Sequence, residues 1–556
     1  MEKNTILAFA LSFLVLLAWA YLFAPKQEPV PPPQAPEVKK TEPAPQPAPP
    51  MKTPEPAAAV PRLEKAEAAT PAGEPLLKDI HVETPLYYAM FSSAGARLKS
   101  FRLKNYHTSP DPKSPLVELM PPEATGANQV GVTFGPPSDQ ARERLLYQVS
   151  ADKVVVNAGA APQELTFSAS TPEGTSITQT FRFHPDRYPI ELTVGVQNPS
   201  ASRTEGNFRA FIRNMLPKEA QSSYSFMGLA LLKDDKLQEI APDDLKEDKS
   251  LSGRIGWMAF ENEYFMTAFI PQGMGEGAFL GKKIPSEHLE ASLLAPAVQI
   301  QPGSRGESRY ILYLGPRDLD ILKEIGNRLE VSVDFGWTDV IAKPLLYTLR
   351  FFNRYVNNYG VAIIILTVLV KILFWPLTHK SYQSMKEMQK IQPLMAKIRE
   401  KYKNNREQMN KEMMALYKTY KVNPMGGCLP MVIQIPVFFA LFRILGSAIE
   451  LRHAPFMLWI NDLSAPDRLF SFPFEIPFMS PPYGIPVLTL LMGASMFIQQ
   501  KMTPTPGDQT QAKVMMLMPI IFTAMFINFP SGLVLYWLIN NILSIGQQYR
   551  ILKKRA

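Results

Sequence analysis

Apolar residues follow a period of two over the middle of this chain. In the segment YPIELTVGV, Ile190, Leu192, Val194 and Val196 alternate with smaller or polar residues, and the segments SITQTFRF and SRYILYLGP behave alike. Strict alternation is typical of β-strands with one buried face. We therefore predict a mostly antiparallel all-β domain over residues 76–330, built as a large sandwich.

Continuous apolar runs replace this alternation after residue 359. Five of them are candidate membrane spans, at 359–377, 428–449, 483–499, 514–529 and 532–546. The last three are short, because about sixteen helical residues reach only about 24 Å against a hydrocarbon core of about 30 Å. We predict a five-helix membrane core within residues 359–556, whose short helices thin the bilayer locally.

The first 75 residues form an anchor and a linker in this interpretation. Residues 1–24 are predicted to be an uncleaved transmembrane anchor, because their apolar run is longer than a usual signal core and carries aromatic residues at its end. Cleavage after the small-x-small sequence Ala18-Trp19-Ala20 is the alternative. Residues 25–75 follow as a periplasmic linker, and the fourteen prolines in 25–61 favour an extended tether without a core.

Amphipathic patterns flank the first span of the core. Residues 331–358 are predicted to form an interfacial amphipathic helix, with Leu346, Leu349, Phe352 and Val356 on its apolar face. Residues 379–423 have apolar positions at steps of three and four, interrupted near residue 404, which predicts a helical coiled hairpin.

The methionines of this hairpin have two interpretations. They are ordinary core residues, or they are flexible side chains that accept varied apolar segments of other proteins. The candidates for such capture are Met385, Met388, Met395, Met409 and Met413.

The net charge of +8 is distributed unevenly. Residues 380–421 contain eleven Lys/Arg against four Glu, and residues 550–555 add a second basic cluster. Basic segments beside membrane spans mark the cytoplasmic side. Placing them there gives six spans with both termini in the cytoplasm, a cytoplasmic hairpin and the β domain outside. Binding to anionic lipid or to ribosomal RNA is a second interpretation of these segments.

A single lysine, Lys371, lies near the middle of the apolar run 361–377. A charge at the bilayer centre costs roughly 3 kcal/mol on insertion scales, and such residues usually face other protein or a water-filled cavity. The alternative is that its ammonium extends to the lipid headgroups, which the central position disfavours. Lys371 is therefore predicted to be a functional charge.

Several classes of chemistry have no counterpart in the sequence. The chain has one cysteine and six scattered histidines, so it has no internal disulfide and no zinc-ligand spacing. HExxH, GxSxG and phosphate-binding glycine motifs are also absent. We predict no metal, no cofactor, no catalytic residue and no enzyme activity.

Four long strings resemble the YidC/Oxa/Alb family of membrane-protein insertases, in its long Gram-negative form. They are PLTHKSYQSMKEMQKIQP, MMALYKTYKVNPMGGCLPMVIQIPVFFALF, ELRHAPFMLWINDLSAPD and FPSGLVLYWLINN. The similarity extends over residues 337–554. It implies a bacterial inner-membrane protein whose outer domain is a periplasmic β-supersandwich, a fold related to sugar-binding domains without implying sugar binding.

The resemblance also implies a hydrophilic groove with one positive residue, usually arginine. Lys371 occupies the matching position, where an ammonium supplies the charge without the bidentate geometry of a guanidinium. Three further residues are implied as polar groove positions, and two as an aromatic face that contacts clients. They are Thr367, Gln434 and Asn540 for the groove, and Tyr536 and Trp537 for the face.

The implied partners are nascent membrane-protein clients, the lipid bilayer and the Sec translocon. Because the chain ends in only a short basic tail, any contact with the ribosome depends more on the loops. The resulting hypothesis is insertion and folding of inner-membrane proteins, alone or with the translocon. The alternatives are a Sec-dependent assembly chaperone without autonomous insertion and a small-molecule transporter, although no internal repeat supports a transporter.

Overall fold

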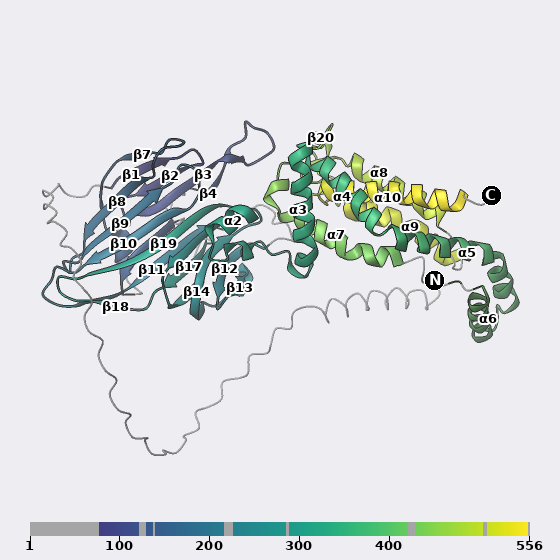
Figure 1. Ribbon diagram of the computed structural model, residues 1–556, viewed down its shortest axis with the longest axis horizontal. Coiled ribbons are helices and arrows are strands. Elements are labelled where there is room, and N and C mark those ends of the chain that lie inside the picture. The colour runs from purple at the N-terminus through teal and green to yellow at the C-terminus, as the bar shows by residue number, and fades with distance from the viewer. Residues whose placement is uncertain are drawn as a thin grey trace, which may run out of the picture. The chain divides into compact units, whose positions relative to one another are not determined.

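The structure is a computed structural model that describes residues 77–553 except 122–128, 137–139, 216–225, 285–287, 421, 423–428 and 504–508 (Figure 1). The predicted anchor 1–24 and linker 25–75 therefore lie outside the described residues. Within them, residues up to 316 contain β-strands with short 3-10 helices, and residues after 318 are mainly helical.

The strands form two hydrogen-bonded series that share β14 (Lys249–Glu261). Residues 249–254 of β14 pair with β16, and residues 258–261 pair with β15. The pairs are antiparallel except for β1 with β7. The first series contains β7 (Lys153–Val155), β1 (Asp79–Glu83), β2 (Tyr87–Ser92), β3 (Arg97–His107), β4 (Leu116–Met120), β5 (Gln129–Gly135), β11 (Thr204–Met215), β17 (His288–Leu294) and β16 (Glu276–Ile284). The second contains β6 (Gln148–Val149), β8 (Gln163–Ser170), β9 (Ser176–Phe183), β10 (Ile190–Gln197), β19 (Arg305–Pro316), β15 (Phe265–Gln272), β12 (Gly228–Lys233) and β13 (Lys236–Ile240), while β18 (Val298–Ile300) pairs with β11.

The predicted large β domain is confirmed, and its core follows the alternation in the sequence. The segments SITQTFRF and YPIELTVGV form β9 and β10, whose buried residues alternate with more exposed ones over most of each strand. Aromatic side chains from the two series meet between the layers: Phe91 of β2 and Phe181 of β9 have ring centroids 4.8 Å apart. Each such pair contributes about 0.5–1.5 kcal/mol beyond its burial.

The helical part begins with α2 (Leu319–Ile325) and contains eight longer helices. They are α3 (Asp339–Val356), α4 (Tyr359–Leu373), α5 (Trp375–Lys401), α6 (Arg406–Thr419), α7 (Leu429–Ser447), α8 (Val487–Met502), α9 (Gln509–Phe526) and α10 (Ser531–Lys553), with a two-stranded sheet of β20 (Leu469–Phe472) and β21 (Tyr483–Ile485) between α7 and α8. The third candidate span, predicted at 483–499, thus begins later, because Tyr483–Ile485 pairs as a strand.

The apolar helices are short. In the part of the chain that the structure describes, no single helix combines the length and apolarity needed to cross a membrane. Together α4 and α5 have both properties but are bent by 65° at their junction, and residues 433–447 and 515–526 form shorter apolar helices. The bend lies at Phe374, the single residue between the end of α4 at Leu373 and the start of α5 at Trp375 and Pro376.

The predicted interfacial segment 331–358 contains two 3-10 turns, η3 (Leu329–Ser332) and η4 (Gly336–Thr338), before α3. Leu346 and Leu349 of its predicted apolar face are buried in the core formed with neighbouring helices. Val356 of that face is exposed, as are Tyr347, Phe351 and Tyr355 elsewhere on α3. The predicted face therefore packs on protein at Leu346 and Leu349 but not along its whole length.

The helices α5 and α6 pack against each other through a small core of their own. It consists of Met388, Ile391, Met395, Met413 and Val422, with Met409 packed at its edge. The predicted break near residue 404 lies between the two helices. Asn405 begins α6 as its N-cap, because its side chain accepts a hydrogen bond from the backbone N–H of Gln408 at 3.1 Å.

Candidate functional site

Lys371 lies in the last turn of α4 and is 9% exposed. Its ammonium donates a hydrogen bond to the hydroxyl of Ser544 on α10, with Nζ and Oγ 2.5 Å apart. The Ser544 hydroxyl donates in turn to the backbone carbonyl of Asn540 at 2.7 Å. Among the described residues, no carboxylate forms an ion pair with Lys371. A cation this strongly desolvated and without a counter-ion attracts negative charge.

A polar stripe on α10 contacts three other helices around Lys371. Residues 540, 541, 544, 547 and 548 recur at helical spacing and lie on one side of α10. The amide of Asn541 donates to the Ser495 hydroxyl of α8 at 2.9 Å, and that of Gln547 donates to the Thr378 hydroxyl of α5 at 3.0 Å. Sequence reasoning identified only Asn540 in this stripe. The spacing NN-x-x-S-x-x-QQ is the signal that would have revealed the others.

The predicted groove residues differ in their surroundings. Thr367 lies one turn before Lys371, and its hydroxyl is satisfied within α4 by the carbonyl of Ile363 at 2.6 Å. The Gln434 amide nitrogen of α7 is buried and has no hydrogen-bond partner in the described part of the chain. Asn540 is half-buried and adjoins the Lys371–Ser544 contact through its backbone. Hydrogen bonds among the described residues thus connect Lys371 through Ser544 to Asn540, but not to Thr367 or Gln434.

The two residues of the predicted client-contacting face lie among the helices, and their contact with clients stays a prediction. Tyr536 is only 1% exposed, and its hydroxyl has no partner among the described residues. Trp537 packs on Phe438 of α7 and Phe526 of α9, with ring centroids 5.1 and 5.3 Å away. In this conformation Tyr536 is buried, and Trp537 is half-buried against α7 and α9.

The five hairpin methionines predicted for client capture differ in burial, and their contact with clients also stays a prediction. Met388, Met395 and Met413 are buried between α5 and α6, where they fill the core of the pair. Met385 and Met409 are half-buried. The exposed methionine nearby is Met414, which was not a candidate. Steps of three and four predict which residues lie on one face, and here that face packs on the partner helix.

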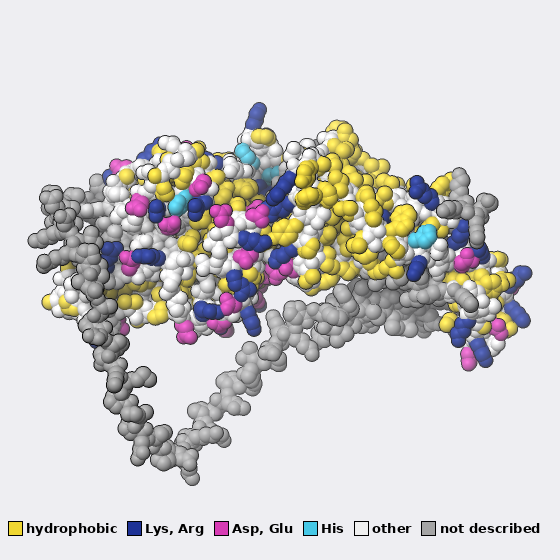
Figure 2. Space-filling model, in the orientation of Figure 1, with side chains coloured by type: hydrophobic (Ala, Val, Ile, Leu, Met, Phe, Trp, Pro, Cys, Tyr) yellow, Lys and Arg dark blue, Asp and Glu magenta, His cyan; other side chains and the backbone are white. Residues whose placement is uncertain are grey.

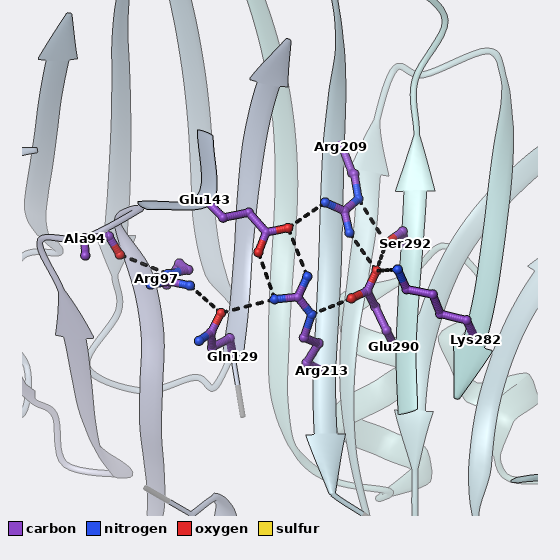
Figure 3. Close-up of polar contacts among 9 residues, drawn as sticks. All are labelled: Ala94, Arg97, Gln129, Glu143, Arg209, Arg213, Lys282, Glu290 and Ser292. Atoms are coloured by element: carbon purple, nitrogen blue, oxygen red, sulfur yellow. Dashed lines mark hydrogen bonds and ion pairs between the residues drawn. The ribbon is translucent and has the colours of Figure 1, made fainter. Parts of the chain in front are cut away.

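The β domain holds a second cluster of charged side chains, which sequence reasoning did not identify (Figure 3). Arg209 and Arg213 of β11 lie between Glu143 of η1 (Gln140–Arg144) and Glu290 of β17. Arg209 Nη1 is 2.8 Å from Glu143 Oε1, and Arg209 Nη2 is 2.6 Å from Glu290 Oε1. Arg213 also pairs with both carboxylates. Lys282 Nζ is 3.3 Å from Glu290.

This cluster is a closed network of opposite charges. Burial raises the pKa of Glu143 and Glu290, but their arginine partners together lower it by more than burial raises it. Both pKa values therefore lie below the usual range. Arg213 and Glu290 are direct cross-strand neighbours in the β11–β17 register. Because the carboxylates and guanidinium groups satisfy one another, the arrangement stabilises the sheet and offers no free nucleophile or base.

Two family descriptions match the chain. The YidC periplasmic domain matches residues 79–348, which is the β domain, and the 60Kd inner membrane protein family matches residues 351–556, which is the helical part. The fold and these matches define the class: an inner membrane protein with a periplasmic domain.

Full-length relatives narrow the assignment. The membrane protein insertase YidC of Syntrophobacter fumaroxidans is 43% identical over 99% of each chain, and that of Pelobacter propionicus is 43% identical over 100% of this chain and 99% of its own. A crystal structure of an active YidC insertase is 16% identical, covers 85% of this chain and 92% of that chain, and has a TM-score of 0.38. The chain belongs to the YidC family of membrane protein insertases.

Proposed function

We propose that this protein inserts clients through the polar site around Lys371. The observation that carries the proposal is a buried ammonium that has a hydroxyl partner on α10 but no carboxylate partner in the described structure. An acidic segment at the end of a client supplies the missing countercharge. The half-buried Asn540 of the polar stripe supplies hydrogen-bonding groups for the client backbone, whereas the other stripe residues are buried against neighbouring helices. No energy source is required, because transfer of an apolar helix into lipid releases free energy.

The proposed topology has six spans with both termini in the cytoplasm. The predicted anchor 1–24 supplies the first span, and the apolar helices α4, α7, α8, α9 and α10 supply the others. The excess of Lys/Arg in residues 380–421 and 550–555 supports a cytoplasmic position for α5, α6 and the end of α10. The short helices match a locally thinned bilayer, which lowers the distance that the polar segment of a client crosses.

The path of a client in this proposal begins at the α5–α6 hairpin. Met385 and Met409 are half-buried there and Met414 is exposed. Contact with the buried Met388, Met395 and Met413 requires the hairpin to open. The client then passes Lys371 together with Thr367, Gln434 and Asn540, and its apolar helix leaves beside Tyr536 and Trp537 after α10 separates from α7 and α9.

The Sec translocon and the ribosome are proposed as partners. With the translocon as partner, the translocon delivers the membrane spans of a client and this protein folds them. This is the assembly-chaperone activity. The basic surface of the hairpin, with Lys and Arg on both helices, fits the phosphate backbone of ribosomal RNA. Dependence of ribosome binding on salt would distinguish this contact from apolar contact with a client.

The experiment uses the purified full chain in liposomes and single-span clients that differ only in tail charge. Protease protection of the translocated tail reports insertion. We expect Lys371→Ala to reduce protection of the acidic tail while leaving a neutral tail unaffected, and Lys371→Arg to retain both because it keeps the charge. Equal loss for both tails would reject the electrostatic role.

Two further outcomes test the alternative functions. Absence of protection with the wild-type protein, restored when the translocon is added, would identify a Sec-dependent chaperone. Saturable flux of a small solute through client-free liposomes would instead identify a transporter.

A further inference from the structure

The β20–β21 hairpin presents large apolar side chains to its surroundings. Phe470, Phe474 and Phe478 are 68%, 60% and 91% exposed. The segment 469–486 contains only one charged residue, Glu475. Exposed aromatic residues with almost no charge among them are unusual on a surface that faces water.

The backbone holds two of these residues in a conformation that bulky side chains rarely adopt. Phe470 has φ 59° and Phe478 has φ 65°, and the exposed Leu458 of the preceding loop has φ 56°. All three lie in the left-handed region, which is unfavourable for large L-residues. Strain that persists at exposed apolar side chains indicates that their outward direction is imposed by the surrounding structure.

Polar groups beneath the hairpin impose this outward direction of the aromatic side chains. Arg468 donates to the carbonyls of Pro482 and Ile527, both at 2.8 Å. Asn528 donates to the carbonyl of Phe478 at 2.9 Å and accepts from the Ser480 N–H at 2.8 Å. The hydrogen-bonding groups of the loop are thus directed toward the helices, and the aromatic rings point away from them.

The hairpin is fixed at the end of the helices where α8 begins and α9 ends. The carboxylate of Asp467, just before β20, accepts from the N–H of Leu488 at 2.5 Å in the first turn of α8. Ile527, which Arg468 contacts, follows the last residue of α9. The exposed Leu490 and Leu491 of α8 lie only a few residues beyond β21, so the apolar surface continues from the hairpin onto the helix.

The continuity of the apolar surface from the β20–β21 hairpin onto α8 indicates what covers the hairpin. Hydrophobic side chains predominate on the visible face of the helical part, whereas Lys, Arg, Asp and Glu are frequent on the β domain (Figure 2). An apolar helical surface in an inner membrane protein faces lipid. We propose that the β20–β21 hairpin is a lipid anchor that places Phe470, Phe474 and Phe478 in the interfacial region of the bilayer at this end of the helices.

The chemistry of the hairpin favours lipid over a protein partner. Phenylalanine rings provide apolar area without donors or acceptors, so they suit the acyl-chain boundary. With one acidic and no basic residue in segment 469–486, the anchor has no preference for anionic headgroups. Its depth in the bilayer is therefore independent of lipid charge.

A depth measurement on the full chain tests this proposal. The single cysteine is replaced by Cys428→Ser, and a small environment-sensitive fluorophore is attached at Phe478→Cys or, separately, at Phe474→Cys. The matched control is Lys113→Cys, an exposed position in a loop of the β domain. The protein is reconstituted into phosphatidylcholine vesicles, with and without phosphatidylglycerol, that contain lipids with a nitroxide near the glycerol.

We expect the nitroxide to quench the labels at 474 and 478 several-fold more than the label at 113. The difference should be equal in vesicles with and without phosphatidylglycerol. Iodide in the buffer should instead quench the label at 113 more than the other two. Quenching of all three labels by iodide and none by lipid would overturn the proposal. Shielding that appears only when the translocon is added would also overturn it, in favour of a protein docking site. No client is present, so the result is independent of insertion activity.

Discussion

Lys371 near the end of α4 and Ser544 on α10 are 173 positions apart in the sequence, yet their side chains are hydrogen-bonded at 2.5 Å. The contact joins the first apolar helix of the core to the last one. It also gives the buried ammonium a fixed position, because Ser544 is itself bonded to its own helix through the Asn540 carbonyl. In the proposed mechanism, a charge held in this way would act on a client without the entropy cost of becoming ordered.

Substitution of Ser544 tests this positioning role. A hydrogen bond to a charged group contributes about 1.5–3 kcal/mol, so we expect Ser544→Ala to slow insertion of an acidic-tailed client by roughly tenfold. Ser544→Thr retains the hydroxyl and should remain close to the wild type. Insertion is measured by protease protection in liposomes. An unchanged rate with Ser544→Ala would show that Lys371 acts without this contact.

Substitution of Glu290 tests the charged network of the β domain. Glu290 is 1% exposed and contacts Arg209, Arg213 and Lys282. Removing one member of a buried ion pair costs about 3–5 kcal/mol, so Glu290→Gln should reduce protection from hydrogen exchange in β11 and β17.

The matched control for that measurement is Glu307→Gln. Glu307 pairs with Arg309 at 2.6 Å, but both side chains are much more accessible to solvent. Such surface pairs contribute about 0–1 kcal/mol. Equal effects of the two substitutions on β11 and β17 would mean that the network does not stabilise the sheet.

The pH dependence of the β domain should show two separate ranges. Glu143 and Glu290 have lowered pKa values, so their contribution to the free energy of unfolding is present above the unfolded pKa and is lost as the pH falls below it. Burial raises the pKa of Glu261 to about 7, although Arg317 opposes the shift. Its protonated form is therefore favoured in the folded state, and stability decreases as the pH rises from the unfolded value of 4.5 to about 7.

The substitution Glu261→Gln isolates the second range. It removes the titration, so the free energy of unfolding of the variant should depend less on pH between about 4.5 and 7 than that of the wild type. Denaturant unfolding at several pH values, followed by a signal from the β domain, measures the difference. Parallel curves for the two proteins would show that Glu261 is not protonated in the folded state.

The hairpin methionines can be separated into packing residues and contact residues. Met395 is buried between α5 and α6, whereas Met414 is exposed. We expect Met395→Ala to destabilise the hairpin by about 2–4 kcal/mol and to increase hydrogen exchange in α6. Met414→Ala should leave exchange unchanged and reduce crosslinking to a client. The reverse pattern would place client contact at the buried methionines.

The sequence predicted the β domain well because its strands are regular. In β9 and β10 the buried face recurs at every second residue, which is a local property of the chain. The long helical repeat of α5 and α6 is equally local, and it predicted the residues that pack together. What it could not distinguish is whether that face contacts the adjacent helix or another molecule, since both require apolar side chains.

The less predictable features depend on distant contacts. The segment at 483–499 is apolar throughout, so its pattern does not reveal that Tyr483–Ile485 pairs with β20. The packing of Trp537 depends on Phe438 of α7 and Phe526 of α9, which meet it only in the folded core. The arginine–glutamate network joins η1, β11 and β17, and none of these segments carries a local sign that the charges meet.

The strand β14 has a mechanical consequence for the periplasmic domain. Its first half is bonded into one layer of the sandwich and its second half into the other, so one continuous strand connects the two layers. The chain has a single cysteine and therefore no internal disulfide. This shared strand has the effect of a cross-link, because the layers cannot separate without breaking hydrogen bonds in both. Unlike a disulfide, this connection is the same under oxidising and reducing conditions.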